Sequence, residues 1–82
     1  MKGRIVCSTK GRDKGYFMVC VGEDGGLLLV CDGKERPLER PKRKSKKHLC
    51  FTDSHLAESE YKTNKSLRKS LAVYKSKIKE EP

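Results

Sequence analysis

Two groups of side chains in this sequence could do chemistry: four cysteines, and a cluster of lysines and arginines. A structural zinc site usually has two ligands about two to four residues apart, because one tight turn must aim both at the same ion. No two cysteines have this spacing, and the nearest approach to it is His48-x-Cys50. The other three, Cys7, Cys20 and Cys31, lie in or at the end of apolar runs, as small buried hydrophobic residues do. We therefore expect no disulfide, no cofactor and no metal, with structural zinc as the alternative.

The lysines and arginines are concentrated in residues 34–48. From Lys34 to Lys47 there are eight basic and two acidic residues, so this stretch holds six of the nine net positive charges of the chain. Such a local excess attracts polyanions through its summed field. A disordered, solubilising segment is the alternative, because blocks of like charge often behave in that way. The residues predicted to contact a polyanion are Lys34, Arg36, Arg40, Lys42, Arg43, Lys44, Lys46, Lys47 and His48.

A second basic segment, residues 11–15, has the sequence Gly-Arg-Asp-Lys-Gly and lies between two apolar runs. Glycine tolerates positive φ, and an aspartate between two glycines can bond to the local backbone, so the segment is predicted to close a hairpin. Its structural residues are then Gly11 and Gly15. Lys10, Arg12 and Lys14 are predicted to add to the polyanion contacts, with a purely structural, solvated turn as the alternative.

Catalysis is not expected from a chain of 82 residues. A domain of this size buries only about 60% of the surface that it exposes when unfolded, which leaves little room for a catalytic cleft. General acid and base chemistry needs a titratable pair held in such a cleft. Asp13, Asp24 and Asp32 all fall in predicted turns, where bonds to the local backbone account for them.

A membrane location is not expected either. A helix needs about 20 consecutive apolar residues to span a bilayer, and the longest uncharged apolar run, residues 16–21, has six. The first residues contain no apolar segment of the kind that drives secretion. The sequence therefore predicts a cytoplasmic protein.

Short apolar or β-branched runs, separated by glycine-containing turns, predict a mainly β domain in the form of a small barrel or sandwich. The loop between the second and third runs is residues 22–26, and Asp32-Gly33 is a strong hairpin signal, so Asp32 and Gly33 are predicted to be structural turn residues. The basic residues 39–47 are expected to stay extended. The predicted strands are residues 3–8, 16–21, 27–31, 34–38 and 48–51.

The last third of the chain predicts an amphipathic helix. Its apolar residues recur at helical spacing, and Thr63 or Asn64 can cap the first turn. We expect the apolar stripe to pack on the barrel, because a domain this small needs the cover, and a partner-binding helix is the alternative. The stripe consists of Leu67, Leu71, Tyr74 and Ile78.

The first 50 residues resemble a KOW motif: a glycine (Gly3), an apolar strand (5–6), a glycine-bracketed basic turn (11–15) and a second apolar strand (17–19). The extension L-V-C-D-G-K-E-R-P-L-E-R-P-K-R-K-S-K-K-H-L also resembles KOW-class large-subunit ribosomal proteins of the archaeal and eukaryotic type, and their short bacterial relatives. Many KOW motifs have a further glycine after the turn, where this chain has Tyr16 and Phe17.

The resemblance implies an SH3-like barrel. We assign this barrel to residues 1–52, with the basic segment 34–48, and the linker and the amphipathic helix predicted above to residues 53–82. It also implies a non-catalytic RNA-binding protein of translation, associated with the ribosome. Its partner would be RNA, specifically ribosomal RNA of the large subunit, with ribosomal proteins as further partners and a monomer when free. The alternative is a KOW protein-interaction module that docks on a transcription or translation component.

Overall fold

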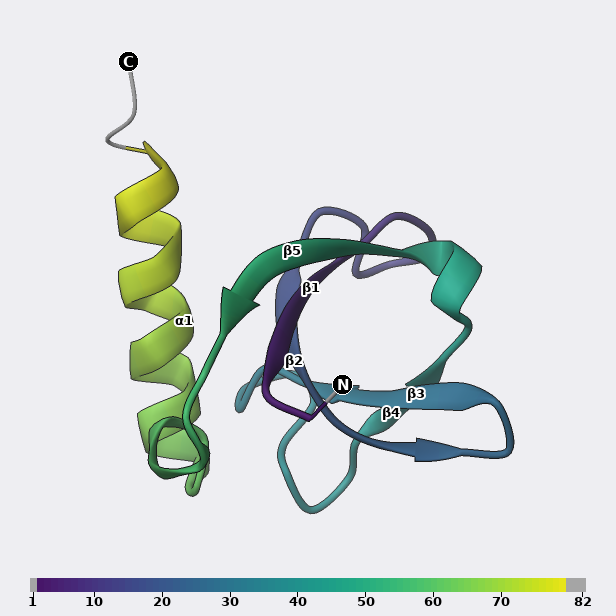
Figure 1. Cartoon of the computed structure of the whole chain (residues 1–82), viewed down its shortest axis with the longest axis horizontal. Coiled ribbons are helices and arrows are strands. Elements are labelled where there is room, and N and C mark those ends of the chain that lie inside the picture. Colours follow the sequence, from purple (N-terminus) through teal and green to yellow (C-terminus); the bar gives the residue numbers. More distant parts are fainter. Residues whose placement is uncertain (1, 80–82) are drawn as a thin grey trace.

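The computed structural model describes residues 2–79 and has a five-stranded antiparallel sheet followed by one C-terminal helix (Figure 1). The prediction of a mainly β chain with a C-terminal helix is therefore confirmed. Residues 1 and 80–82, at the ends of the two predicted units, lie outside the described residues. The elements are β1 (Arg4–Ser8), β2 (Phe17–Asp24), β3 (Leu27–Cys31), β4 (Lys42–Lys44), η1 (Lys46–His48), β5 (Leu49–His55), η2 (Glu58–Glu60) and α1 (Asn64–Lys79).

The sheet has the strand order β4-β3-β2-β1-β5, and it curls so that β5 arches over the interior opposite β3 and β4 (Figure 1). The last strand thus lies beside the first, with Ser8 opposite Leu49 and Val6 opposite Phe51. The short connection through η1 carries the chain from one edge of the sheet to the other. Within residues 2–79 the two edge strands, β4 and β5, are not paired with each other.

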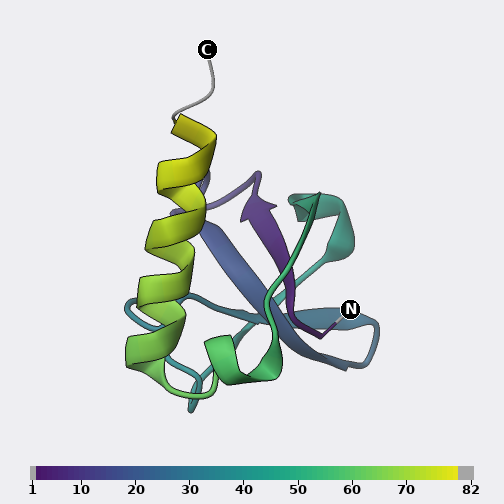
Figure 2. The same cartoon turned by 60° about the vertical axis from the view of Figure 1, so that its left-hand side comes forward.

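Two apolar clusters hold the fold together, one on each face of the sheet. Neighbouring strand residues point to opposite faces, so Val6 of β1 enters the inner cluster and Ile5 enters the outer one. The inner cluster consists of Val6, Met18, Cys20, Leu28, Val30 and Leu49. The outer cluster joins Ile5, Val19 and Cys31 of the sheet to Leu67 and Leu71 of α1. Helix α1 therefore covers the outer face of β1 and β2, as Figure 2 shows from a second direction.

The helix begins where Thr63 caps it: the Thr63 Oγ1 accepts the backbone N–H of Ser66 at 3.1 Å. Farther along, Tyr74 lies edge-on to Phe17 of β2, with ring centroids 5.2 Å apart. The predicted stripe is not covered along its whole length, because Ile78 is exposed. The last turns of the helix extend past the sheet (Figure 1).

The prediction of a strand at residues 34–38 is wrong. The Oδ1 atom of Asp32 accepts the backbone N–H groups of both Lys34 and Arg36 at 2.9 Å, which curls the chain just after β3. The strand that pairs with β3 is β4, inside the basic segment that was expected to stay extended without burying itself. Gly33 is a turn residue with φ +81°, and a Cβ atom at this position would lie 2.6 Å from the carbonyl oxygen of Asn64. The start of α1 therefore packs directly on this glycine.

Two other strand boundaries differ from the predictions. Strand β2 runs to Asp24 through a register shift between Cys20 and Gly22, so the loop predicted at 22–26 shrinks to the two glycines 25 and 26. Strand β5 is Leu49–His55 rather than residues 48–51, and the unit boundary predicted at residue 52 falls inside it. In both strands polar residues continue the pairing after the apolar run ends, and apolar patterning alone does not reveal this.

Candidate nucleic-acid interface

Asp13 lies at the centre of the 11–15 turn, and its carboxylate connects that turn to strand β4 through hydrogen bonds. Its Oδ1 atom accepts hydrogen bonds from Lys44 Nζ at 2.6 Å and Ser8 Oγ at 2.7 Å, and its Oδ2 atom accepts one from Lys42 Nζ at 2.9 Å. Lys44 Nζ also donates to the carbonyl oxygen of Lys10 at 2.6 Å. We call Ser8, Asp13, Lys42 and Lys44 the Asp13 cluster. It joins segments that lie about thirty residues apart in the sequence.

The Asp13 cluster is largely shielded from water, with the side chains of Asp13 and Lys44 13% and 6% exposed. Desolvation alone would raise the pKa of Asp13. The hydrogen bonds from Lys44, Ser8 and Lys42, together with the charge of Lys42, outweigh it and hold the pKa well below its usual value of 3.8. Asp13 is therefore a permanent anion under ordinary conditions, and it stabilises the two lysines in one position.

The three basic side chains of strand β4 point alternately to opposite faces of the sheet. Lys42 and Lys44 point to the face that meets Asp13, while Arg43 between them points away. Arg43 pairs with Asp24 at 2.7 Å, with its side chain 67% exposed, and Lys46 lies 3.8 Å from Glu23. The strand thus supplies one shielded cation, one partly shielded cation and one that faces solvent.

The remaining predicted residues lie around the Asp13 cluster on loops. Gly11 and Gly15 have φ values of +90° and +87°, as the predicted turn requires. His48 is half-buried at the end of η1. Among residues 2–79, Lys46 is paired with Glu23, and none of the other exposed cations in these loops forms an ion pair. They are Lys10 just before the 11–15 turn, Arg12 and Lys14 within it, Lys34, Arg36 and Arg40 of the loop between β3 and β4, and Lys47 of η1.

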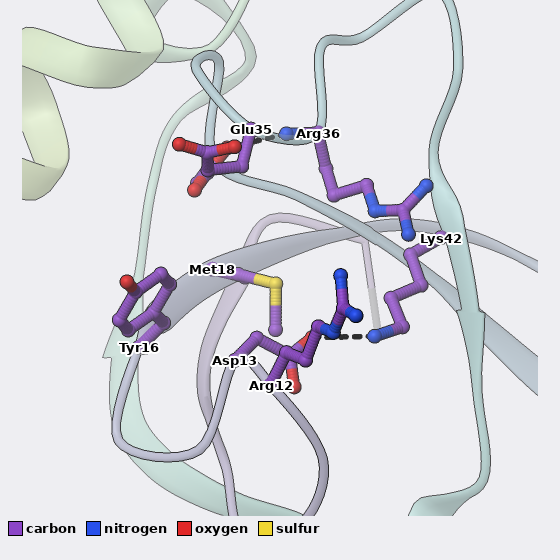
Figure 3. A pocket seen from close by; sticks show the side chains of 8 residues that line it. Arg12, Asp13, Tyr16, Met18, Glu35, Arg36 and Lys42 are labelled. Carbon is purple, nitrogen blue, oxygen red and sulfur yellow. Dashed lines mark hydrogen bonds and ion pairs between the residues drawn. The ribbon is translucent and has the colours of Figure 1, made fainter.

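A hollow of about 420 Å³ lies between the 11–15 turn, the start of β2, the 32–36 turn and β4. Figure 3 shows Met18 near its centre, with Arg12, Arg36, Lys42 and the carboxylate of Asp13 on one side and Glu35 on the other. Tyr16 stands at the rim. We call this cavity the β2 hollow. Its lining residues are Arg12, Asp13, Tyr16, Met18, Asp32, Glu35, Arg36 and Lys42.

A second hollow, of about 490 Å³, lies between the C-terminal half of α1 and strand β5. Its apolar wall includes Leu56, Val73 and Ile78, and the last two are exposed. Lys69 and Lys77 also line it. We call it the helix groove.

Several residues of the site were not identified as such from the sequence. Asp13 was expected to bond the local backbone, yet its carboxylate bonds side chains of β1 and β4. Met18 and Glu35 were not singled out, and Tyr16 was noted only as a residue that stands where many KOW motifs have a glycine. One signal was available: the Lys-Arg-Lys alternation of residues 42–44 in a short run is compatible with a strand that places two cations on one face. Their partner, however, is set only by the tertiary fold.

The cysteines give no sign of a shared site. All four are free thiols, and no group of three or more His, Cys, Asp or Glu residues within 2–79 is arranged to hold a metal ion. Burial, with help from nearby Asp32, raises the pKa of the Cys31 thiol to about 12, so this thiol stays protonated and behaves as an apolar side chain. In the same residues we find no helix whose length and apolarity would let it cross a membrane.

Comparison of the sequence with known protein families and with curated proteins gives no match. The function is therefore inferred from the residues of the interface.

Proposed function

We propose that this chain is a non-catalytic RNA-binding protein of the KOW class, in which the curled sheet acts as an SH3-like barrel. Its target in this proposal is structured RNA, specifically ribosomal RNA of the large subunit, and it acts in translation while associated with the ribosome. The binding surface consists of the exposed cations of the 11–15 turn, the loop between β3 and β4, and η1.

One observation carries the proposal: the Asp13 cluster brings together basic segments that are far apart in the sequence. Because Asp13 bonds both Lys42 and Lys44, the 11–15 turn is held against β4. Arg12 from the turn, Arg36 from the loop and Lys42 from β4 then line one hollow. A surface with cations from three segments at fixed positions fits the phosphates of a folded RNA, which is recognised mainly by its shape.

The cations of this surface differ in what they can do. Arginine presents a planar fork that matches phosphate, so Arg12, Arg36 and Arg40 are the proposed principal phosphate ligands. Lys44 is omitted from the proposed contacts, because it is buried and bonded to Asp13. With about five phosphate contacts, the logarithm of the affinity is expected to fall against the logarithm of salt concentration with a slope of about −4.

The test is co-sedimentation with purified large ribosomal subunits at low and moderate salt. We compare the native chain with the triple variant Arg12→Glu, Arg36→Glu, Arg40→Glu, and with a charge-matched control, Lys62→Glu, Lys65→Glu, Lys75→Glu. All six positions are exposed. We expect the first variant to bind at least tenfold more weakly at low salt and the control to bind within about twofold of the native chain. Circular dichroism establishes that both are folded. Equal losses in the two variants would show that only net charge matters, and would contradict the proposed surface.

The alternative, a module that docks on a protein of the transcription or translation machinery, has the helix groove in its favour. Its exposed Val73 and Ile78 form an apolar wall of the kind found in protein interfaces. RNase treatment separates the two functions. An RNA-binding protein is released from ribosomal material when the RNA is digested, whereas a protein-docking module keeps its partner.

A further inference from the structure

The β2 hollow has features that phosphate binding alone does not use. Met18 forms an apolar floor and is itself buried, at 1% exposure. Tyr16 at the rim is 48% exposed, although an aromatic ring of this size is usually covered in a folded domain. The volume of about 420 Å³ lies in the range of small-molecule sites, about 300 to 1,000 Å³. The hollow therefore offers an apolar floor and a ring face to a flat ligand.

The β2 hollow is lined by charges of both signs, three cations and three carboxylates. Figure 3 shows Arg12, Lys42 and the guanidinium of Arg36 on one side, together with the carboxylate of Asp13, and Glu35 on the opposite side. Lys42 is engaged with Asp13, whereas Arg12 and Arg36 form no ion pair within residues 2–79. A ligand that fits both sides must carry negative charge at one end and hydrogen-bond donors at the other.

Of the three carboxylates that line the β2 hollow, Asp32 and Glu35 have acceptor capacity left. Asp32 uses Oδ1 for the N–H groups of Lys34 and Arg36, and no donor reaches its Oδ2 within the described part of the chain. Glu35 is exposed and has neither an ion pair nor a side-chain hydrogen bond there. These carboxylates would repel a simple anion. A bare phosphate is therefore a poor match for the whole hollow.

We infer that the β2 hollow binds one unpaired guanine nucleotide of an RNA. The base stacks on Tyr16 over Met18, its phosphate meets Arg12 and Arg36, and its Watson–Crick edge faces Asp32 and Glu35. Unstacked bases of RNA are commonly bound by aromatic stacking together with hydrogen bonds to that edge. Guanine alone among the four bases presents two adjacent N–H donors there, which a carboxylate accepts together. This inference rests on the proposed RNA binding and adds a subsite to it.

The test compares two labelled RNA stems of about 16 base pairs, the length that a small RNA-binding domain can span. One stem is fully paired and the other has a single bulged guanosine. Stacking of a base on an aromatic side chain contributes about 1–3 kcal/mol, so we expect the bulged stem to bind the native protein about tenfold more tightly in fluorescence anisotropy. Stems with a bulged adenosine, cytidine or uridine are expected to lose most of this preference.

Four variants of the chain assign the preference to the β2 hollow. Tyr16→Ala is expected to lower affinity for the bulged stem to that for the paired stem, while leaving the paired stem unaffected. Tyr16→Phe keeps a stacking ring and is expected to keep the preference. Glu35→Gln is expected to reduce the discrimination between guanosine and the other bulged bases. Leu27→Ala, at an exposed position on β3, is the control and is expected to change nothing.

The outcomes separate this inference from the proposed function. Equal affinity for both stems, or no effect of Tyr16→Ala, overturns the guanine subsite and leaves RNA binding intact. Failure to bind either stem or the ribosomal subunit overturns both. Displacement of the bulged stem by micromolar GMP would overturn the assignment to RNA and would make the hollow a site for a free nucleotide. Release only at millimolar GMP supports the inference.

Discussion

Lys44 and Arg43 are neighbours in the same short strand, and yet the structure gives them opposite environments. The Lys44 side chain is 6% exposed and bonded to Asp13, whereas the Arg43 side chain is 67% exposed and pairs with Asp24 at the surface. A strand turns successive side chains to opposite faces, so one residue joins the interior and the next faces solvent. A basic run therefore cannot be treated as a uniform patch. Part of its charge holds the fold, and only the rest is available to a partner.

The largest effect is expected from Asp13→Ala. Removing this carboxylate leaves Lys44 as a buried cation without a counter-charge, and breaking such a pair typically costs 3–5 kcal/mol. We expect a loss of about 3 kcal/mol in the free energy of unfolding, measured by urea denaturation. The control is Asp24→Ala, which removes the partner of Arg43. If the two variants lose equal stability, the contrast between the two environments is wrong.

The second-largest effect is expected from acid, which should lower the free energy of unfolding by protonating Asp13. The pKa of Asp13 is lowered in the folded chain, so its contribution to stability is complete above the unfolded value of 3.8 and is lost as pH falls through the lower, folded value. We expect Asp13 to add a slope of up to about 1.4 kcal/mol per pH unit below pH 4. Urea denaturation at a series of pH values measures this slope. In Asp13→Asn the decline should be shallower over the same range, and an unchanged decline would assign the acid sensitivity to other carboxylates.

Lys42→Ala should have an intermediate effect. This side chain is 27% exposed and bonds one oxygen of Asp13, while the bond from Lys44 remains. We expect a loss of about 1 kcal/mol in unfolding free energy, near the upper limit for partly exposed pairs. Because Lys42 helps to lower the pKa of Asp13, that pKa should rise in the variant. A carboxyl titration followed by NMR measures it, and an unchanged pKa would show that Lys44 and Ser8 alone stabilise the anion.

The smallest effect on stability is expected from Arg43→Ala. Exposed ion pairs contribute between about 0 and 1 kcal/mol, so the free energy of unfolding should change by less than about 0.5 kcal/mol. Its RNA binding should nevertheless become less dependent on salt, with the slope reduced by about 1 if Arg43 contacts a phosphate. A stability loss as large as that of Lys42→Ala would place Arg43 among the structural cations.

The sequence predicted the features that depend on local pattern. Residues 27–31 form the predicted strand, and Leu67 and Leu71 pack as the helical spacing indicates. The 11–15 turn has its positive φ at both glycines. Each of these follows from neighbours within a few residues, where glycine conformation, alternation and helical period decide the outcome.

The parts that could not be predicted depend on contacts over long sequence distances or on side chains that replace backbone pairing. The return strand was expected at 34–38. The side chain of Asp32, however, accepts backbone N–H groups that such a strand would donate to its neighbour in the sheet. The burial of Lys44 depends on Asp13, 31 residues earlier. A lysine in a basic run is normally solvated, and only the tertiary structure shows that a carboxylate lies within hydrogen-bond distance of Lys44. The β2 hollow likewise joins residues from three separate stretches of the sequence, 12–18, 32–36 and residue 42.

The position of β5 beside β1 has a consequence for how the chain is made. The edge of β1 that pairs with residues 49–55 has no partner while those residues are still unsynthesised. An unpaired strand edge is a template for association with other chains, and pairings this distant in sequence form slowly. Net charge of one sign keeps incomplete chains apart. The positive charge that we assign to RNA recognition would therefore also protect the nascent chain from aggregation until its last strand arrives.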